Sequence, residues 1–551
     1  MIYSSIFCLF GIVFTNVVAE PLPIRRREEN ATTNRNTFAS MTPSKTLAWV
    51  PCYGDSLAAE LGPVSCARLI APLDYLNTSF GDVQLAIIKL GASNHTQTTR
   101  TVFVNGGGPG GDPIDFITDR GALLRAQVGN DVDLVGIVPR GVGSTFPPIT
   151  CDATDLASAQ RNRDITDSQP GYTDKSLNES YAVGESLELD CDLVTPSLVP
   201  YVGTVHVAKD MDYVLQILGQ DKLSYLYPGY SYGSILGATY AALFPDKIDR
   251  MALDGIVDFN SWYKPEKEPG FDIGDADTAL NNFFQFCYDA GPDKCAFWYS
   301  SPKEIRDRFF EGDQRFLENP LPIPGFGLLK IPLWRLGVYS ALYQPARGFA
   351  LLASVAAEIY NRAPGRGIKS YLEFVNNVSS PLESPLVDTT TGLKNSPNIV
   401  YTIFCSDSGG RAEGTGMSKL EAVFNKYQGV SQYFGGLSSQ IEIICLSAGL
   451  PAKERFTEKF ENIRTSNPIL FVGNTADPTT PLRNAFSMSK AFPGSSVLTI
   501  NGTGHLSYSA TQDSECTAEW IVPYFTNGTL PPNATVCKGK QTPFELPTTQ
   551  L

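Results

Sequence analysis

Residues 225–255 read YLYPGYSYGSILGATYAALFPDKIDRMALDG, and this stretch decides the fold class. An apolar run leads into a serine set between two glycines, a run of small residues follows, and a second apolar run closes the stretch. Gly229, Ser231 and Gly233 fit Gly-x-Ser-x-Gly, a sharp turn from strand to helix that exposes a serine hydroxyl above a sheet. Because such a pentad also arises by chance in a chain with 48 Gly, the remaining sequence must decide whether Ser231 is a nucleophile.

The chain has three histidines that could serve as the base that a serine nucleophile requires. His95 lies inside a glycosylation sequon, and His206 opens an amphipathic stretch in which a structural role is the default. His505 follows an apolar run and lies in a loop that contains glycines, which predicts a position at the carboxyl end of a strand. We therefore predict that His505 is the base.

Asp477 is the candidate for the acid that orients this histidine. It follows the short apolar run 468–472 and precedes Pro478. An aspartate in a turn that contains proline is more often only a turn former. The chain order of serine, acid and histidine, together with the predicted position at a strand end, favours the catalytic role.

The segment TVFVNGGGPGGDP, residues 101–113, is a candidate oxyanion loop. Its glycines let backbone N–H groups approach a substrate and stabilise the negative charge that develops on the carbonyl oxygen. A phosphate cradle is the alternative, but neither Gly-Lys-Ser/Thr nor Gly-x-Gly-x-x-Gly follows. We predict that the N–H groups of Gly108 and Tyr232 are the donors, and we expect no metal and no organic cofactor.

Several segments together resemble a known family. They are CARLIAPLDY (66–75), VFVNGGGPGG (102–111), DLVGIVPRGVGS (133–144), GYSYGSILGATYAALFPDKIDRMALDGIVD (229–258), PILFVGNTADPTTPL (468–482) and GTGHLSYS (502–509). In this order, and over about residues 46–540, the chain resembles the secreted tripeptidyl aminopeptidases of the α/β-hydrolase fold, which are related to prolyl aminopeptidases. The resemblance implies for Ser231, Asp477 and His505 the same roles that the residues themselves predict.

The chain departs from the family pattern beside the substrate. Gly106 and Asp112 stand where the family has proline and serine in Asn-Pro-Gly-Gly-Pro-Gly-Gly-Ser. Ile137 and Val138 stand where it has the Trp-Asp of Trp-Asp-Pro-Arg-Gly. These departures concern substrate specificity more than hydrolysis.

The expected fold class is α/β, with the mostly parallel central sheet of an α/β hydrolase and an inserted, mainly helical cap. Strand and helix patterns alternate from about residue 66 to residue 258, and the next stretch is helical and rich in aromatic residues. The predicted parts are a signal peptide at 1–19, a flexible leader or pro-segment at 20–45, a first core part at 46–260, a cap at 261–440, a second core part at 441–540 and a tail at 541–551.

Three features predict a secreted protein. Residues 1–19 form a short apolar run that ends in small residues, as a signal peptide does. Of the 11 Cys, Cys8 lies in this segment, and the even number that remains suits disulfides, although a metal site is the rival interpretation. The predicted pairs are sequence neighbours: Cys52 with Cys66, Cys151 with Cys191, Cys287 with Cys295, Cys405 with Cys445, and Cys516 with Cys537. Glycosylation sequons occur at Asn30, Asn77, Asn94, Asn178, Asn377, Asn501, Asn527 and Asn533.

The net charge of −14 argues against nucleic acid or an anionic membrane as a partner. The predicted activity is that of a secreted serine exopeptidase that releases short peptides or single residues from free N-termini. A peptide amino group requires a counter-charge, and Asp407 and the acids of EKEPGFDIGDAD (266–277) are the candidates. The alternatives are an esterase or lactonase that acts on small metabolites with the same triad, and an inactive binding protein on this fold.

Overall fold

The computed structural model describes most of the chain after residue 36. The described residues are 37–94, 96, 99–227, 231–265, 273–324, 326–370, 372, 398–411, 416–450, 452–510, 515–532, 534–539 and 541–545. The predicted signal peptide, His95 and Gly229 lie outside them, as do the predicted glycosylation sites Asn30, Asn377 and Asn533.

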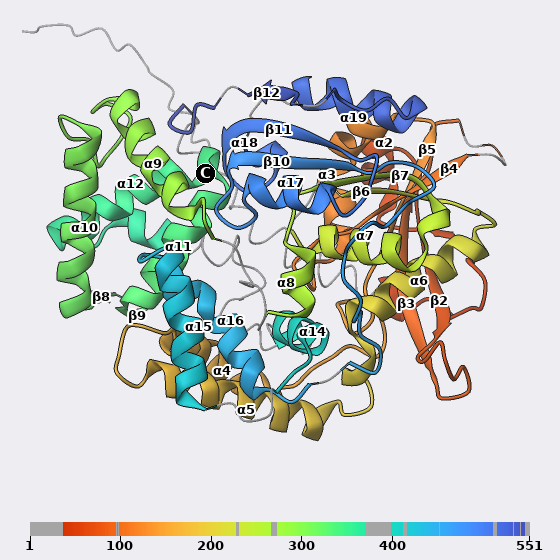
Figure 1. Cartoon of the computed structure of the whole chain (residues 1–551), viewed down its shortest axis with the longest axis horizontal. Helices are drawn as coiled ribbons and strands as arrows, with labels where there is room; N and C mark the ends of the chain where they lie inside the picture. The colour runs from red at the N-terminus through yellow and green to blue at the C-terminus, as the bar shows by residue number, and fades with distance from the viewer. Residues whose placement is uncertain are drawn as a thin grey trace, which may run out of the picture.

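A ten-stranded sheet runs through the described residues in the order β1-β2-β3-β5-β4-β6-β7-β10-β11-β12 (Figure 1). Pairs from β1 to β5 are antiparallel, and every neighbouring pair from β5 to β12 is parallel. This arrangement confirms the predicted α/β class with a mostly parallel central sheet. The strands are Val50–Pro51, Val64–Pro72, Asp82–Leu90, Arg100–Val104 (β4), Val132–Ile137 (β5), Leu223–Tyr227 (β6), Ile248–Asp254 (β7), Leu470–Ala476 (β10), Ser496–Thr503 (β11) and Val536–Lys538.

Continuous apolar runs form the central strands because helices cover both faces of a parallel sheet. The helix that follows β6, α7 (Tyr232–Leu243), lies close against the sheet. A Cβ atom added to Gly237 would lie 2.6 Å from Leu253 Cδ2 and 2.8 Å from Tyr225 Cε1. Gly237 therefore lets α7 pack close against β6 and β7. The other helices beside the core strands are α2 (Gly54–Leu61), α3 (Pro113–Val128), α6 (Thr204–Ile217), α17 (Leu482–Ser489), α18 (Ser507–Ala510) and α19 (Glu515–Asn527).

A second, largely helical layer is inserted between β7 and β10, and it has its own apolar core (Figure 1). It contains α9 (Ala276–Ala290), α10 (Pro302–Glu318), the hairpin β8–β9 (Leu321–Ile323, Gly327–Leu329), α11 (Ile331–Tyr343), α12 (Pro345–Asn361), α15 (Met417–Val430) and α16 (Gly435–Ser447). The same insertion includes α8 (Phe259–Tyr263) and α14 (Asn398–Ser408), whose buried side chains belong to the core around the sheet. Two helices from an earlier part of the chain, α4 (Asp155–Asp167) and α5 (Ser176–Val194), pack against α11, α15 and α16. The helical layer thus draws on two insertions rather than one.

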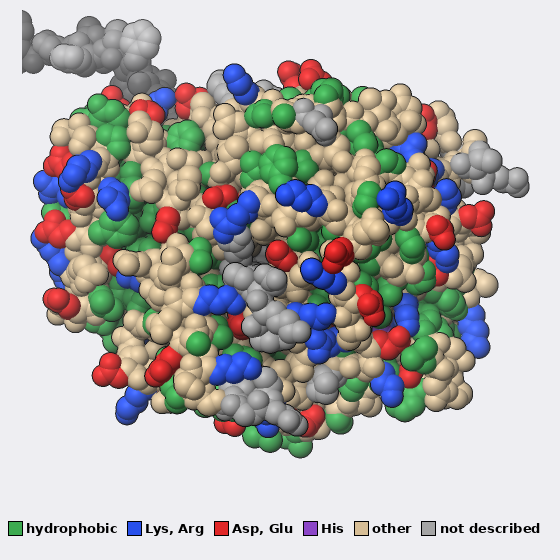
Figure 2. Space-filling view, viewed as in Figure 1, with side chains coloured by type: hydrophobic (Ala, Val, Ile, Leu, Met, Phe, Trp, Pro, Cys, Tyr) green, Lys and Arg blue, Asp and Glu red, His purple; other side chains and the backbone are tan. Residues whose placement is uncertain are grey.

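None of the described helices combines the length and the apolar character that a membrane crossing demands. On the face of the molecule seen in Figure 2, acidic and basic side chains are interspersed.

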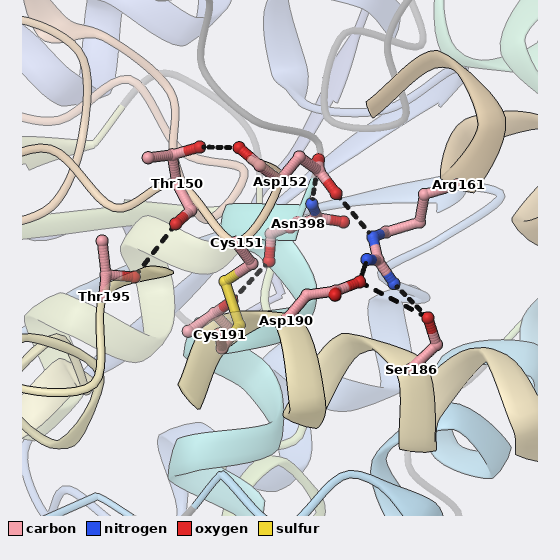
Figure 3. Close-up of a disulfide and its surroundings, with 10 residues drawn as sticks. Thr150, Cys151, Asp152, Arg161, Ser186, Asp190, Cys191, Thr195 and Asn398 are labelled. Carbon is pink, nitrogen blue, oxygen red and sulfur yellow. Dashed lines mark hydrogen bonds and ion pairs between the residues drawn. A yellow bond between two sulfur atoms is a disulfide. The ribbon is translucent and has the colours of Figure 1, made fainter. Parts of the chain in front are cut away.

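The ten cysteines among the described residues are joined in the five pairs that their spacing predicts. The pair Cys151–Cys191 links the loop after β5 to α5 (Figure 3). Beside it, the buried guanidinium of Arg161 donates to Asp152 Oδ1 at 2.8 Å, and Asn398 of α14 donates to the other oxygen of Asp152 at 2.5 Å. The disulfide and this polar cluster together join α4, α5 and α14.

Replacement of Arg161 by methionine is expected to lower the free energy of unfolding by about 3 kcal/mol, because the carboxylate of Asp152 would stay buried without its charged partner. Denaturant unfolding measures this change. Arg163→Met is the matched control, since Arg163 is exposed on the same helix and should change stability by less than about 0.5 kcal/mol. Equal stability of the two variants would contradict the prediction.

Candidate active site

Ser231 lies in a sharp turn between β6 and α7, as its motif predicts. Its φ of 39° and ψ of −62° place it in a region that residues with a side chain rarely adopt. Its carbonyl oxygen accepts hydrogen bonds from the N–H of Ser234 at 2.9 Å and from the Ser234 hydroxyl at 2.6 Å. Backbone strain of this kind gathers at functional sites, where the surrounding structure holds it.

Asp477 and His505 are in direct contact, although they lie in different loops. Asp477 follows β10 and His505 follows β11, and these two strands are parallel neighbours, so their carboxyl ends meet at one edge of the sheet. His505 Nδ1 lies 3.0 Å from each carboxylate oxygen of Asp477, and both side chains are buried. An imidazole that is held at Nδ1 has Nε2 as the nitrogen that can exchange protons with a substrate.

The carboxylate of Asp477 also stabilises the turn in which it lies. Its Oδ1 accepts hydrogen bonds from the N–H groups of Thr479 and Thr480, both at 2.9 Å. Its Oδ2 accepts the N–H of Leu506 at 3.1 Å. The side chain of Asp477 therefore stabilises its turn and contacts the histidine at the same time.

The helical layer contributes directly to the position of His505. The N–H of His505 donates to the carbonyl oxygen of Tyr343, the last residue of α11, at 3.0 Å. The Tyr343 ring stands edge-on to the imidazole with 4.8 Å between the ring centroids. The Thr479 hydroxyl donates to the Tyr343 hydroxyl at 2.6 Å, and burial raises the pKa of Tyr343 to about 12, so that this phenol stays neutral. Sequence reasoning missed Tyr343, because no motif signals a contact across this distance in the chain.

A second buried carboxylate, Asp254 at the end of β7, holds the same loop. It accepts the N–H of Ser507 at 3.0 Å and the Ser507 hydroxyl at 2.7 Å. Burial raises the pKa of Asp254 to about 6, the two Ser507 donors oppose that rise, and the charge of Asp477 adds to it. Sequence analysis did not select Asp254, although an acid at the end of the apolar run MALD was the signal that could have found it.

The start of α7 and the His505 loop both contact the short segment that follows β7. The hydroxyl of Ser234, in the first turn of α7, accepts the N–H of Val257 at 3.2 Å. At Gly255, in the same segment, an added Cβ atom would lie 3.2 Å from His505 Cε1. The structure thus joins Asp477 to His505 and sets Ser231 at the same edge of the sheet, while the catalytic role of each of the three residues stays a prediction.

The predicted oxyanion loop follows β4, whose neighbour in the sheet is β6. The Asn105 side chain accepts the N–H of Gly107 at 2.8 Å, and the Gly107 carbonyl accepts the N–H of Gly111 at 2.9 Å. The loop is so tight that a Cβ atom at Gly111 would lie 2.5 Å from the carbonyl oxygen of Gly106. Gly108 and Tyr232 lie beyond the ends of these neighbouring strands, and their role as oxyanion donors stays a prediction.

The candidate acids for binding a substrate amine differ in how the protein already uses them. Asp407 is fully buried and accepts hydrogen bonds from the Thr204 N–H at 2.8 Å, the Thr204 hydroxyl at 2.5 Å and the Trp262 indole at 2.9 Å. Burial raises the pKa of Asp407 to about 6. Asp277 accepts the Ser431 hydroxyl at 2.6 Å. Glu266, Glu268 and Asp272 lie outside the described residues.

Asp275, which precedes α9, is the remaining described acid of that set, and it is half-buried. Burial raises the pKa of Asp275 to about 6, and the nearby charge of Asp477 adds to the rise, while a hydrogen bond from the Leu482 N–H opposes it. Further along α9, Asn282 donates to Thr503 Oγ1 at 2.7 Å, just before the His505 loop. The first half of α9 therefore lies beside the Asp477–His505 pair.

Among the described residues, no group of three or more histidine, cysteine, aspartate or glutamate side chains is arranged to hold a metal ion.

Two family models match parts of this chain. The family model described as "alpha/beta hydrolase fold" matches residues 102–291, and the one described as "TAP-like protein" matches residues 431–537. The chain is 27% identical over 500 residues to "Serine protease Hip1" of Mycobacterium tuberculosis, which covers 89% of this chain and 90% of the relative. It is 24% identical over 469 residues to "Tripeptidyl aminopeptidase" of Streptomyces lividans, with 83% of this chain and 80% of the relative covered. It is 25% identical over 481 residues to "Carboxylesterase B" of Mycobacterium tuberculosis, with 87% of each chain covered.

Proposed function

Because this chain is an aminopeptidase-like serine hydrolase with the α/β-hydrolase fold, we propose that it removes short peptides or single residues from the free N-termini of peptides. The contact between Asp477 and His505, at the sheet edge where Ser231 lies in its strained turn, is the observation that carries the proposal. The names of two relatives, a serine protease and a tripeptidyl aminopeptidase, support peptides as the substrate class.

The proposed reaction is acyl transfer through Ser231. His505 takes the proton of the Ser231 hydroxyl as its oxygen attacks the scissile carbonyl, and later gives a proton to the leaving amine. Asp477 keeps the imidazole oriented through Nδ1 and stabilises its cation. The N–H groups of Gly108 and Tyr232 stabilise the negative charge on the carbonyl oxygen. Water then hydrolyses the ester at Ser231 and restores the free enzyme.

An exopeptidase must also recognise the charged amino terminus of its substrate. Of the candidate acids, Asp275 fits this role best, because it is half-buried beside the Asp477–His505 pair. Asp407 fits the role less well, because its carboxylate already accepts three hydrogen bonds from the protein. A carboxylate whose charge is destabilised by burial and by Asp477 gains most from a bound ammonium group.

The experiment that tests this function compares a free-amine peptide p-nitroanilide with its N-acetylated twin. We expect kcat/KM to be at least about tenfold higher for the free amine at neutral pH, because only that substrate carries the ammonium group. The advantage should fade below pH 6, where Asp275 becomes protonated, and above about pH 8, where the substrate amine loses its charge. Equal rates on the twins at every pH would end the exopeptidase proposal.

An esterase is the second candidate, and the similarity to a protein named Carboxylesterase B favours it. The same triad would hydrolyse a small neutral ester, which needs no counter-charge. Aryl esters assayed beside the twin peptides separate the two functions. An esterase would cleave the ester far faster than either peptide. Its activity would not fall at the pH at which the amine of a free-amine peptide loses its charge.

Asp275→Asn is expected to raise KM for the free-amine peptide about tenfold and to leave the acetylated twin within twofold, because it removes the charge but little volume. Steady-state kinetics on both substrates measure this difference. Asp277→Asn is the matched control, since Asp277 lies in the same segment and already accepts a hydrogen bond from Ser431. A loss of the same size on both twins would show that Asp275 supports the fold and not the amine.

We also propose that the protein acts outside the cell. The apolar leader, the sequons and the five disulfides support this location, because disulfides persist in oxidising compartments. Protein sequencing of the mature N-terminus, after expression with the leader, tests it. A mature chain that still begins at Met1 would contradict the proposal.

A further inference from the structure

The turn that carries His505 is held by two buried carboxylates from two neighbouring strands. Asp477 follows β10, and Asp254 ends β7, which pairs with β10 in parallel register. Asp477 contacts His505 and the N–H of Leu506, whereas Asp254 accepts both donors of Ser507. Three consecutive residues of this turn are therefore anchored to carboxylates.

The backbone of this turn requires such anchors. Leu506 has a φ of 73°, a left-handed conformation that is unfavourable for a residue with a branched side chain. Its conformation is kept by neighbours on both sides, where Asp477 holds the preceding residue and Asp254 holds the following one. A relaxed turn would rotate the imidazole, and small misplacements of a catalytic group cost large factors in rate.

Burial destabilises the negative charge of Asp254. Asp254 is 4% exposed and Ser507 is 3% exposed, so water stabilises neither. Its pKa of about 6 leaves Asp254 ionised at neutral pH. The titratable groups that face it are Asp477, which repels it, and His505, which attracts it when protonated. The phenol of Tyr343 also faces the imidazole and stays neutral.

We propose that Asp254 is a positioning residue for the hydrolytic reaction. It fixes the turn 505–507, and its negative charge stabilises the imidazolium that His505 becomes during acyl transfer. This inference rests on the proposed role of His505 as the base. Asp254 acts through Ser507 and through the electric field, without a contact to the reacting atoms. The proposed site thus has one carboxylate that orients the ring and a second that fixes the turn from the other side.

Two variants separate the charge from the hydrogen bonds. Asp254→Asn removes the charge and keeps one oxygen that can accept from Ser507, while Ser507→Ala removes the hydroxyl donor and keeps the charge. Titration of the histidine rings, followed by NMR with carbon-13 at Cε1, reports the protonation of His505 without any substrate. Burial lowers the pKa of His206 to about 2, so its signal stays constant over roughly pH 5 to 9, and a His95→Gln variant assigns the third signal.

In Asp254→Asn we expect the midpoint of the His505 titration and the acid limb of kcat/KM to fall together by about one pH unit. We also expect kcat at neutral pH to fall about tenfold, with KM within twofold. In Ser507→Ala we expect kcat to fall about threefold, with the His505 midpoint unchanged. A merely structural role would lower the melting temperature and leave the midpoint in place.

An unchanged His505 midpoint in Asp254→Asn, with kcat within twofold of the wild type, would overturn the inference. If that variant does not fold, Ser507→Ala decides, and an unchanged kcat there would count against the positioning role. If instead His505 is not the base, the His505→Gln variant would retain activity, with or without the Asp254→Asn substitution. This result distinguishes failure of the proposed function from failure of the inference about Asp254.

Discussion

Ser231→Ala is expected to lower kcat by a factor on the order of 10⁴ or more, on whichever substrate the wild type cleaves, because Ser231 is the proposed nucleophile of the acyl-enzyme. The residual rate would come from substrate binding and the oxyanion donors alone. The missing hydroxyl should also abolish covalent labelling by a fluorophosphonate probe, which measures the nucleophile independently of the substrate.

The unfolding midpoint is the control for this variant. Alanine removes only the hydroxyl, and the hydrogen bonds from Ser234 go to the backbone carbonyl of residue 231, so the turn itself should persist. The unfolding midpoint should therefore change little. Retained activity or retained labelling in a folded Ser231→Ala protein would show that the nucleophile lies elsewhere.

Asp477→Asn is expected to lower kcat by about 10³-fold to 10⁴-fold at neutral pH, because an amide cannot stabilise the imidazolium and can fix the wrong tautomer of the ring. Both carboxylate oxygens lie 3.0 Å from His505 Nδ1, so the charge acts at close range. A pre-steady-state burst separates a slower acylation from a slower release of product.

Thr480→Val is the matched comparison for Asp477→Asn. The Thr480 hydroxyl lies 3.2 Å from the same Nδ1, yet it carries no charge. We expect its loss to cost about tenfold, as for a single hydrogen bond. A loss below tenfold in Asp477→Asn, together with a larger loss in Asp254→Asn, would make Asp254 the catalytic acid instead.

The sequence predicts the active-site loops well where the chemistry limits the choices. His505 could be selected because histidine is scarce, and the contact with Asp477 is present in the structure. The sharp turn at Ser231 is present as its motif predicts. The disulfide pairs follow from cysteines that lie near one another in the chain, as Cys287 and Cys295 do.

What the sequence does not predict depends on contacts between distant segments. The carbonyl of Tyr343 carries no signal in the sequence, because every residue has such an oxygen. Asp254 ends an apolar run and does not show from the pattern which loop it will hold. The packing of α4 on α11, and of α5 on α15 and α16, arises from tertiary contacts between separate segments of the chain, which local periodicity cannot show.

The hydrogen bond from the His505 N–H to the last residue of α11 couples the position of His505 to the helical layer. The helical layer is then not an interchangeable module, since a transplanted layer would have to place a carbonyl oxygen at the same point. Chimaeras with relatives should exchange shorter pieces that leave the end of α11 in place. The same contact leaves segments of the helical layer away from Tyr343 open to redesign, while His505 and its backbone partner have to be kept together.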